Sequence, residues 1–122
     1  VLNSLPQDNG LYFPENIPAL PTSFFKDLTS KSKADIGFEV AKAFIGNEIP
    51  ADRLHQIVSE TIDFELPLVE VSPCIHALEL FHGPTWAFKD VGARFLSRCT
   101  GYFMEAQDQE VHVLVATSGD TG

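Results

Sequence analysis

The sequence has few cysteines and few basic residues, and it has no long apolar run. Two cysteines, Cys74 and Cys99, with no Cys-x-x-Cys pair exclude a disulfide framework and favour reduced thiols in the cytoplasm. Eight lysines and arginines against 17 acidic residues give a net charge of −9, which argues against nucleic acid or an anionic membrane as a main partner. The longest clean apolar stretch, 113–116, is far below the roughly 20 residues of a membrane span. We also expect no signal peptide in these residues.

The composition is that of a globular domain. Hydrophobic residues make up 44% of the 122 residues and charged residues 20%, which is too apolar for a disordered tail. A chain of this length buries roughly two-thirds of its unfolded surface on folding, so a core is possible without disulfides or metal. No internal repeat or low-complexity tract is present.

Helix breakers punctuate the first third of the chain. They are Pro6, Gly10, Pro14, Pro18 and Pro21. Between them, residues 11–13 have room only for a short strand or an extended anchor. Residues 22–30 predict one short helix, with Phe24, Phe25 and Leu28 on one face.

Residues 33–63 predict a helical hairpin. Ser32 and Asp35 form a weak capping box before the first helix, and Gly46-Asn47 ends it in the manner of a C-cap. Pro50 suits the first turn of the second helix, where a missing N–H costs nothing. The apolar stripes that predict the two helices are Ile36, Val40 and Phe44, then Leu54, Ile57, Val58 and Ile62.

After Pro67 the period changes from helical to alternating. Residues 68–71 and 77–81 predict two strands, with a turn at Ser72-Pro73. A long helix follows from about Phe88, and residues 111–116 are typical of a buried parallel strand. The order strand, helix, strand predicts an α/β sheet with a right-handed crossover. The helix stripe consists of Phe88, Val91, Phe95, Cys99 and Phe103.

Small, hydroxylated and glycine residues follow the last predicted strand, at 117–122. Open α/β sheets bind ligands at this position, and a following helix would direct free N–H groups at an anion. A plain strand-to-helix turn with an N-cap residue explains the same pattern. The residues alone leave both interpretations open.

Lys89 is the second candidate. It follows the turn at 83–86 and enters the first turn of the predicted helix. A cation is unfavourable there, and the helix field together with packing on Phe88 favours the uncharged, nucleophilic amine used in Schiff-base chemistry. The alternative is an ordinary lysine lying over an aromatic ring.

Basic residues gather on this same helix. Residues 89–98 carry a net charge of +2, whereas the rest of the chain carries −11. Arg94 and Arg98 could bind phosphate or carboxylate, or pair with acidic groups of the chain itself. Cys74, His76 and His82 fit no standard zinc spacing, so no metal is expected.

Two motifs resemble the threonine synthase family closely. They are LFHGPTWAFKD at 80–90 and ATSGDTG at 116–122, and the segments GLYFP at 10–14 and AFIGNEIP at 43–50 are similar to that family's N-terminal region. The lysine motif is long and specific. The second motif alone indicates only the wider group of tryptophan-synthase-like enzymes that use pyridoxal 5′-phosphate (PLP).

The resemblance implies a fold and an activity. Residues 1–66 would be a mostly helical N-terminal region, and 67–122 the start of a truncated parallel-sheet PLP domain of fold type II. The family is a carbon–oxygen lyase of threonine biosynthesis that converts O-phospho-L-homoserine and water to L-threonine and phosphate. PLP would be bound as a Schiff base to Lys89, the catalytic residue, which would also move protons.

The resemblance also assigns the other site residues. Phe88 and Asp120 would bind the cofactor, and Asp120 stands where many enzymes of the wider fold have asparagine. Ser118, Gly119 and Thr121 would bind substrate, with Arg94 as a further substrate ligand.

Parts of the family's site are not in this sequence. The glycine-rich cup for the cofactor phosphate lies further along in the family, so we expect a piece of a longer chain, inactive alone and lacking its C-terminal part. The expected partner is a small-molecule substrate in the cytoplasm. Another fold-type-II enzyme, such as a serine or threonine dehydratase, and a non-catalytic anion-binding or interaction module remain as alternatives.

Overall fold

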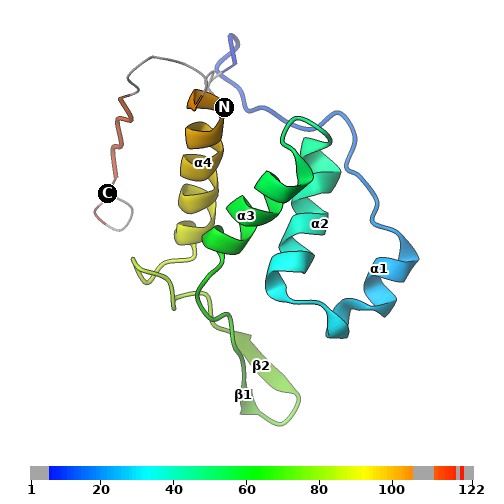
Figure 1. Cartoon of the computed structure of the whole chain (residues 1–122). Coiled ribbons are helices and arrows are strands. Elements are labelled where there is room, and N and C mark those ends of the chain that lie inside the picture. Colours follow the sequence, from blue (N-terminus) through cyan, green and yellow to red (C-terminus); the bar gives the residue numbers. More distant parts are fainter. Residues whose placement is uncertain (1–5, 106–111, 118, 120–122) are drawn as a thin grey trace. The chain divides into compact units, whose positions relative to one another are not determined.

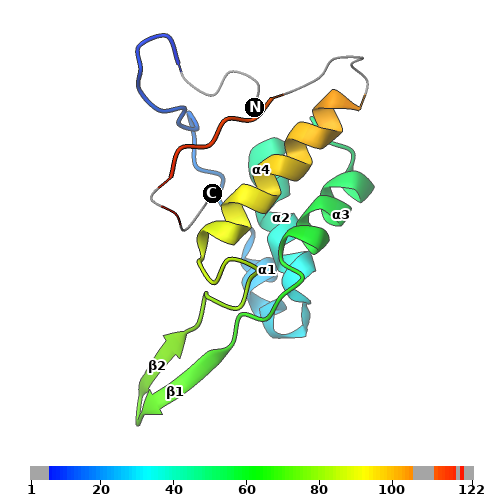
Figure 2. The same cartoon turned by 90° about the vertical axis from the view of Figure 1, so that its left-hand side faces the viewer.

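The computed structural model describes residues 6–105, 112–117 and 119. The chain forms two compact units, Val1–Glu60 and Thr61–Gly122. Helices dominate both units, and one small sheet interrupts them (Figures 1 and 2). The elements are α1 (Thr22–Lys26), the 3-10 helix η1 (Leu28–Ser30), α2 (Lys33–Ile45), α3 (Ala51–Thr61), β1 (Leu68–Ser72), β2 (Ile75–Leu78) and α4 (Lys89–Met104).

The helix predicted over 22–30 is present as two short pieces, α1 and η1. The break falls at Asp27, whose carbonyl accepts a hydrogen bond from the Ser30 hydroxyl at 2.8 Å. Phe24 is buried, but Phe25 is exposed and meets it only edge to face. Of the predicted apolar face, only Phe24 is therefore buried.

The start of α2 confirms the predicted capping box. The Asp35 N–H donates to the Ser32 hydroxyl oxygen at 3.1 Å, and the Ser32 N–H donates to the Asp35 carboxylate at 3.3 Å. Both bonds satisfy N–H groups that have no partner within the helix. Gly46 ends the helix as predicted, with a φ of +64°, and its N–H donates to the Lys42 carbonyl at 2.8 Å.

Replacing Ser32 with alanine is expected to lower the free energy of unfolding by about 1 kcal/mol, because the cap loses its acceptor. Chemical denaturation of the two proteins measures this difference. Ser59→Ala is the matched control, since Ser59 is an exposed serine inside α3. Equal losses in the two variants would contradict a specific role for the cap.

Asp35 also joins α2 to α3, which lie side by side (Figures 1 and 2). The His55 Nε2 atom on α3 lies 2.9 Å from the Asp35 carboxylate, and the His55 ring lies 5.4 Å from the Phe38 ring, between centroids. The Ser32 hydroxyl donates a hydrogen bond to the Asp35 carboxylate at 2.6 Å, and this bond, followed by the contact with His55, lowers the pKa of Asp35 from its ordinary 3.8 to about 2. The Asp35 carboxylate therefore takes part in the cap of α2 and also contacts α3.

This lowered pKa predicts a loss of stability in acid. Because the unfolded chain takes up the proton more readily, the contribution of Asp35 is complete above pH 3.8 and is lost as the pH falls toward about 2. Unfolding free energies measured across this interval should fall less steeply in Asp35→Asn than in the unchanged protein. Glu39→Gln, on the same helix, should leave the slope as it was, and an equal change there would refute the assignment.

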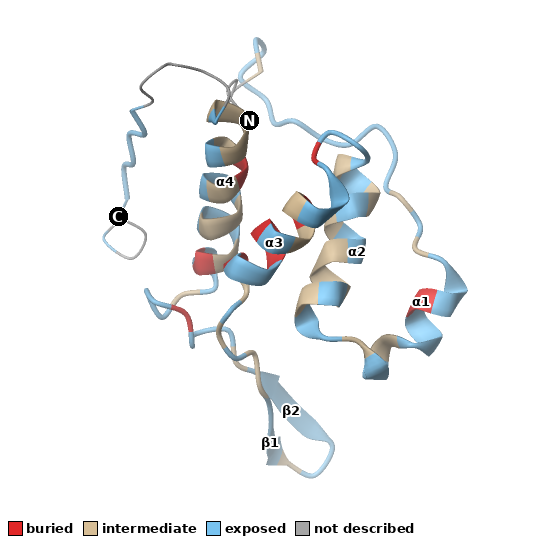
Figure 3. Ribbon diagram, in the orientation of Figure 1, coloured by how far each residue is buried: buried red, intermediate tan, exposed pale blue. Residues whose placement is uncertain are grey.

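The core of the first unit lies on α3 and on the loop before it (Figure 3). Leu54, Ile57 and Val58 are buried as the stripe predicts, and so is Ile49 in the loop. Pro50 precedes the helix and does not lie in its first turn, since the first helical residue is Ala51. The Pro50 carbonyl accepts from the Leu54 N–H at 2.9 Å.

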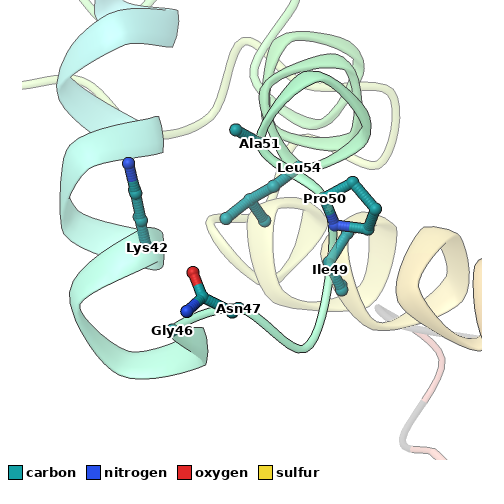
Figure 4. A pocket seen from close by; sticks show the side chains of 7 residues that line it. All are labelled: Lys42, Gly46, Asn47, Ile49, Pro50, Ala51 and Leu54. Carbon is teal, nitrogen blue, oxygen red and sulfur yellow. The ribbon is translucent and has the colours of Figure 1, made fainter.

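A small pocket of about 140 Å³ lies beside this loop. Side chains from α2 and α3 border it, with Lys42 and Leu54 on the two helices (Figure 4). Its remaining lining residues are Gly46, Asn47, Ile49, Pro50 and Ala51.

The predicted apolar stripe of α2 is not a core. The helix contains no buried residue, Val40 is exposed, and Phe44 is 55% exposed. The spacing correctly placed these residues on a helix. Periodicity, however, shows that side chains share a face and not that something covers the face.

β1 and β2 form an antiparallel hairpin. Leu68 pairs with Leu78 and Glu70 with His76, and the register shifts before Ser72, which pairs with Ile75. Two strands are confirmed, but the second begins at Ile75 and ends at Leu78, earlier than the predicted 77–81. A short turn can join only antiparallel strands. The described part of the chain therefore contains no parallel pair.

α4 is the predicted long helix, and it continues past Gly101 to Met104. Cys99 is buried on it as predicted, and burial raises the pKa of its thiol, which keeps it protonated. No helix in the described ranges is both long and apolar enough to cross a membrane.

The buried strand predicted at 111–116 is not found. Residues 112–117 belong to no strand, and Leu114 is 95% exposed, while Val111 lies outside the described residues. A parallel strand needs neighbouring strands to bond with, and β1 and β2 bond to each other. The apolar sequence alone does not supply those neighbours.

Candidate functional site

The structure places Lys89 at the first position of α4, as predicted. The side chain is exposed, and so is the ring of Phe88 before it, so packing on Phe88 does not bury the amine. Two short-range bonds wind the first turn: the Asp90 N–H donates to the Ala87 carbonyl at 3.1 Å and the Val91 N–H to the Phe88 carbonyl at 3.2 Å. The Lys89 side chain therefore extends from a hydrogen-bonded first turn of α4.

A tight turn leads into this lysine. The Trp86 N–H donates to the Gly83 carbonyl at 3.1 Å. Trp86 has a φ of +59°, a left-handed conformation that costs a bulky residue on the order of 1 kcal/mol. Such a conformation persists only where neighbouring contacts impose it.

Asp90 makes contacts with the same turn, at Thr85. Asp90 is only 4% exposed, and its carboxylate accepts from the Thr85 N–H at 3.0 Å and from the Thr85 hydroxyl at 2.8 Å. Gly83 leaves the space for the carboxylate, since a Cβ there would lie 3.0 Å from the Asp90 carboxyl carbon. The sequence prediction assigned no role to Asp90 or Thr85. The available signal was a hydroxyl and a carboxylate that flank the lysine turn.

Arg94 lies on α4, roughly one and a half turns after Lys89. Its Nη2 atom lies 2.8 Å from the Asp63 carboxylate, and its guanidinium lies 5.6 Å from the centroid of the Phe64 ring. The acid pairing that the sequence left open is therefore present. Whether Arg94 also binds substrate stays a prediction.

The predicted substrate loop is described only at Thr117 and Gly119. Ser118, Asp120 and Thr121 lie outside the described residues. Gly119 has a φ of +117°, and its N–H donates to the Thr117 hydroxyl at 2.9 Å. The structure thus brings Lys89 and Phe88 into one turn, places Arg94 on the same helix, and leaves Gly119 in a separate segment.

His82, which precedes the lysine turn, makes a local contact. His82 Nε2 lies 2.6 Å from the Glu79 carboxylate. Across the described ranges, no group of three or more His, Cys, Asp or Glu side chains is arranged to hold a metal ion. Cys74 is exposed in the β1–β2 turn.

The chain is similar to known proteins over its whole length. Residues 1–62, just over half of it, match the family model described as "Threonine synthase N terminus". Threonine synthase of Escherichia coli is 37% identical over 122 residues, and that of Schizosaccharomyces pombe is 38% identical over 136. Each match covers all of this chain, which spans 28% and 26% of those proteins, respectively.

A solved structure extends the likeness to the fold. The crystal structure of PLP-bound threonine synthase from Brucella melitensis matches with a TM-score of 0.79 and 37% identity, over 84% of this chain and 23% of that one. The neighbour is thus a PLP-binding protein. Together with the family model, these matches show that the chain belongs to the threonine synthase family.

Proposed function

We propose that the protein carrying this chain is a PLP-dependent carbon–oxygen lyase that converts O-phospho-L-homoserine and water to L-threonine and phosphate. The observation that carries this proposal is the placement of the motif lysine. Lys89 stands exposed at the start of α4, behind an ordered turn, in a chain of the threonine synthase family.

The residues present fit the aldehyde end of PLP. Lys89 offers a primary amine that solvent can reach, and Phe88 offers an exposed ring beside it. The PLP-bound neighbour supports the same cofactor. When bound, PLP supplies the electron sink for eliminating the phosphate and adding water. The parallel sheet of fold type II belongs to the same proposal, with residues 1–66 as N-terminal region and 67–122 as the start of the catalytic domain.

The chain's own residues have three tasks in this proposal. Lys89 holds the cofactor through its amine and moves protons as acid and base. Ser118, Gly119 and Thr121 bind the substrate, and Asp120 binds the cofactor. The guanidinium of Arg94 offers bidentate geometry for an anionic group, although Asp63 already occupies part of it.

Substrate assays with the full-length protein separate this proposal from its alternatives. Phosphate and threonine released together from O-phosphohomoserine, and only with PLP, are the expected result. A serine or threonine dehydratase would instead release ammonia from the free amino acid and no phosphate. A non-catalytic binding module would do neither, and either outcome would refute the lyase.

Residues 1–122 alone are expected to be inactive and to bind PLP poorly, because the family's phosphate cup lies further along its chains. Incubation with PLP followed by borohydride reduction tests this expectation. Stoichiometric trapping at Lys89 in the isolated 122 residues would contradict it.

A further inference from the structure

The carboxylate next to Lys89 faces away from solvent and back into the turn. Asp90 is buried, and both of its oxygens are used, one by the Thr85 N–H at 3.0 Å and one by the Thr85 hydroxyl at 2.8 Å. This differs from ordinary helix capping, in which a residue before the helix accepts from N–H groups inside it. Here a residue inside the helix accepts from a residue that lies five positions earlier.

The contact between Asp90 and Thr85 also restricts the direction of the Lys89 side chain. Neighbouring side chains in an α-helix leave its axis roughly 100° apart. If the Asp90 side chain is held toward Thr85, the first turn of α4 cannot rotate about its axis, and the direction of Lys89 is fixed with it. Hydrogen bonds to an ionised carboxylate are the strong kind, which suits this task.

The surroundings leave little room for another arrangement. At Gly83 any larger residue would crowd the carboxyl group, because its Cβ would lie 3.0 Å from the Asp90 carboxyl carbon. Trp86, which lies between Gly83 and Asp90 in the sequence, adopts a left-handed conformation. The turn is therefore built around the carboxylate.

We propose that Asp90, held by Thr85, is a positioning residue that aims the Lys89 amine at the cofactor. The proposal rests on the proposed function, because it concerns the same lysine. Asp90 itself does not touch the reacting atoms.

The test compares Lys89 with another lysine of the same chain. Full-length protein is freed of PLP, mixed with limiting PLP and reduced with borohydride, and peptide mass spectrometry gives the ratio of modified Lys89 to modified Lys26, an exposed lysine of α1. Asp90→Asn and Thr85→Val should each lower this ratio about tenfold, the effect of losing a bond to a charged group. Thr85→Ser keeps the hydroxyl and should restore the ratio.

A separate variant tests whether a loss of stability alone changes the ratio of modified Lys89 to modified Lys26. Cys99→Ala opens a cavity on the same helix without changing the turn, and it should leave the ratio unchanged. If Asp90→Asn does not fold, Thr85→Val decides the question. Unchanged ratios in the folded variants, or an equal fall in Cys99→Ala, would overturn the positioning role. If Lys89 is not preferred over Lys26 even in the unchanged protein, the proposed function itself fails.

Discussion

Replacing Lys89 with alanine in the full-length protein is expected to lower phosphate release from O-phosphohomoserine by roughly a thousandfold, within the range for loss of a positioned acid–base group. The reason is that the amine has two tasks, holding the cofactor and moving protons. Steady-state measurement of phosphate release at saturating PLP checks this result. It is the largest effect that we expect from one substitution.

The variant Lys89→Arg distinguishes a covalent role of the Lys89 amine from a role of its positive charge. Arginine keeps the positive charge at the start of α4, but its guanidinium stays protonated and cannot replace a nucleophilic amine. If the amine is what matters, this variant should be as inactive as Lys89→Ala. If Lys89 contributes only charge, it should retain most of the activity, and the covalent role would be refuted. Lys26→Ala should leave turnover unchanged, since Lys26 is an exposed lysine of α1.

The second large effect concerns stability. Leu54 on α3 is 0% exposed, so Leu54→Ala removes buried methyl groups and leaves a cavity. We expect the free energy of unfolding to fall by about 3 kcal/mol, within the range for buried leucines. Urea denaturation measures this, and the midpoint should fall with little change in slope.

The chain offers a matched control for this substitution. Leu96 on α4 is 56% exposed, so Leu96→Ala removes the same atoms from a position where water already reaches them. Its cost should stay within about 0.5 kcal/mol, as for ordinary surface changes. Similar losses at the two leucines would show that Leu54 does not belong to a packed core.

The elements predicted correctly were those that depend on nearby residues. The capping box of Ser32 and Asp35 and the glycine end of α2 at Gly46 are set within a few positions of the chain. The start of α4 at Lys89 and the burial of Cys99 follow equally from local turn chemistry and helical spacing. For the capping box and the end of α2, the partner of each backbone group lies within four positions of the chain.

The predictions that failed depend on distant partners. The spacing of Val40 and Phe44 predicted a helix correctly, but burial needs a covering surface that spacing does not reveal. Residues 112–116 have the composition of a buried strand, and only neighbouring strands make such a segment one. The Asp90–Thr85 contact was missed for a different reason: the pair is local, but nothing in a pattern of residue types shows which way a carboxylate turns.

The contact between Asp35 and His55 has a consequence for the order of folding. It spans only 20 positions of the chain, and the cap at Ser32 spans three. Contacts this short close quickly, because little loop entropy is lost before they form. Since synthesis proceeds from the N-terminus, α2 and α3 can pair while later residues are still being added. The Asp35–His55 contact can therefore form before the rest of the chain has been made.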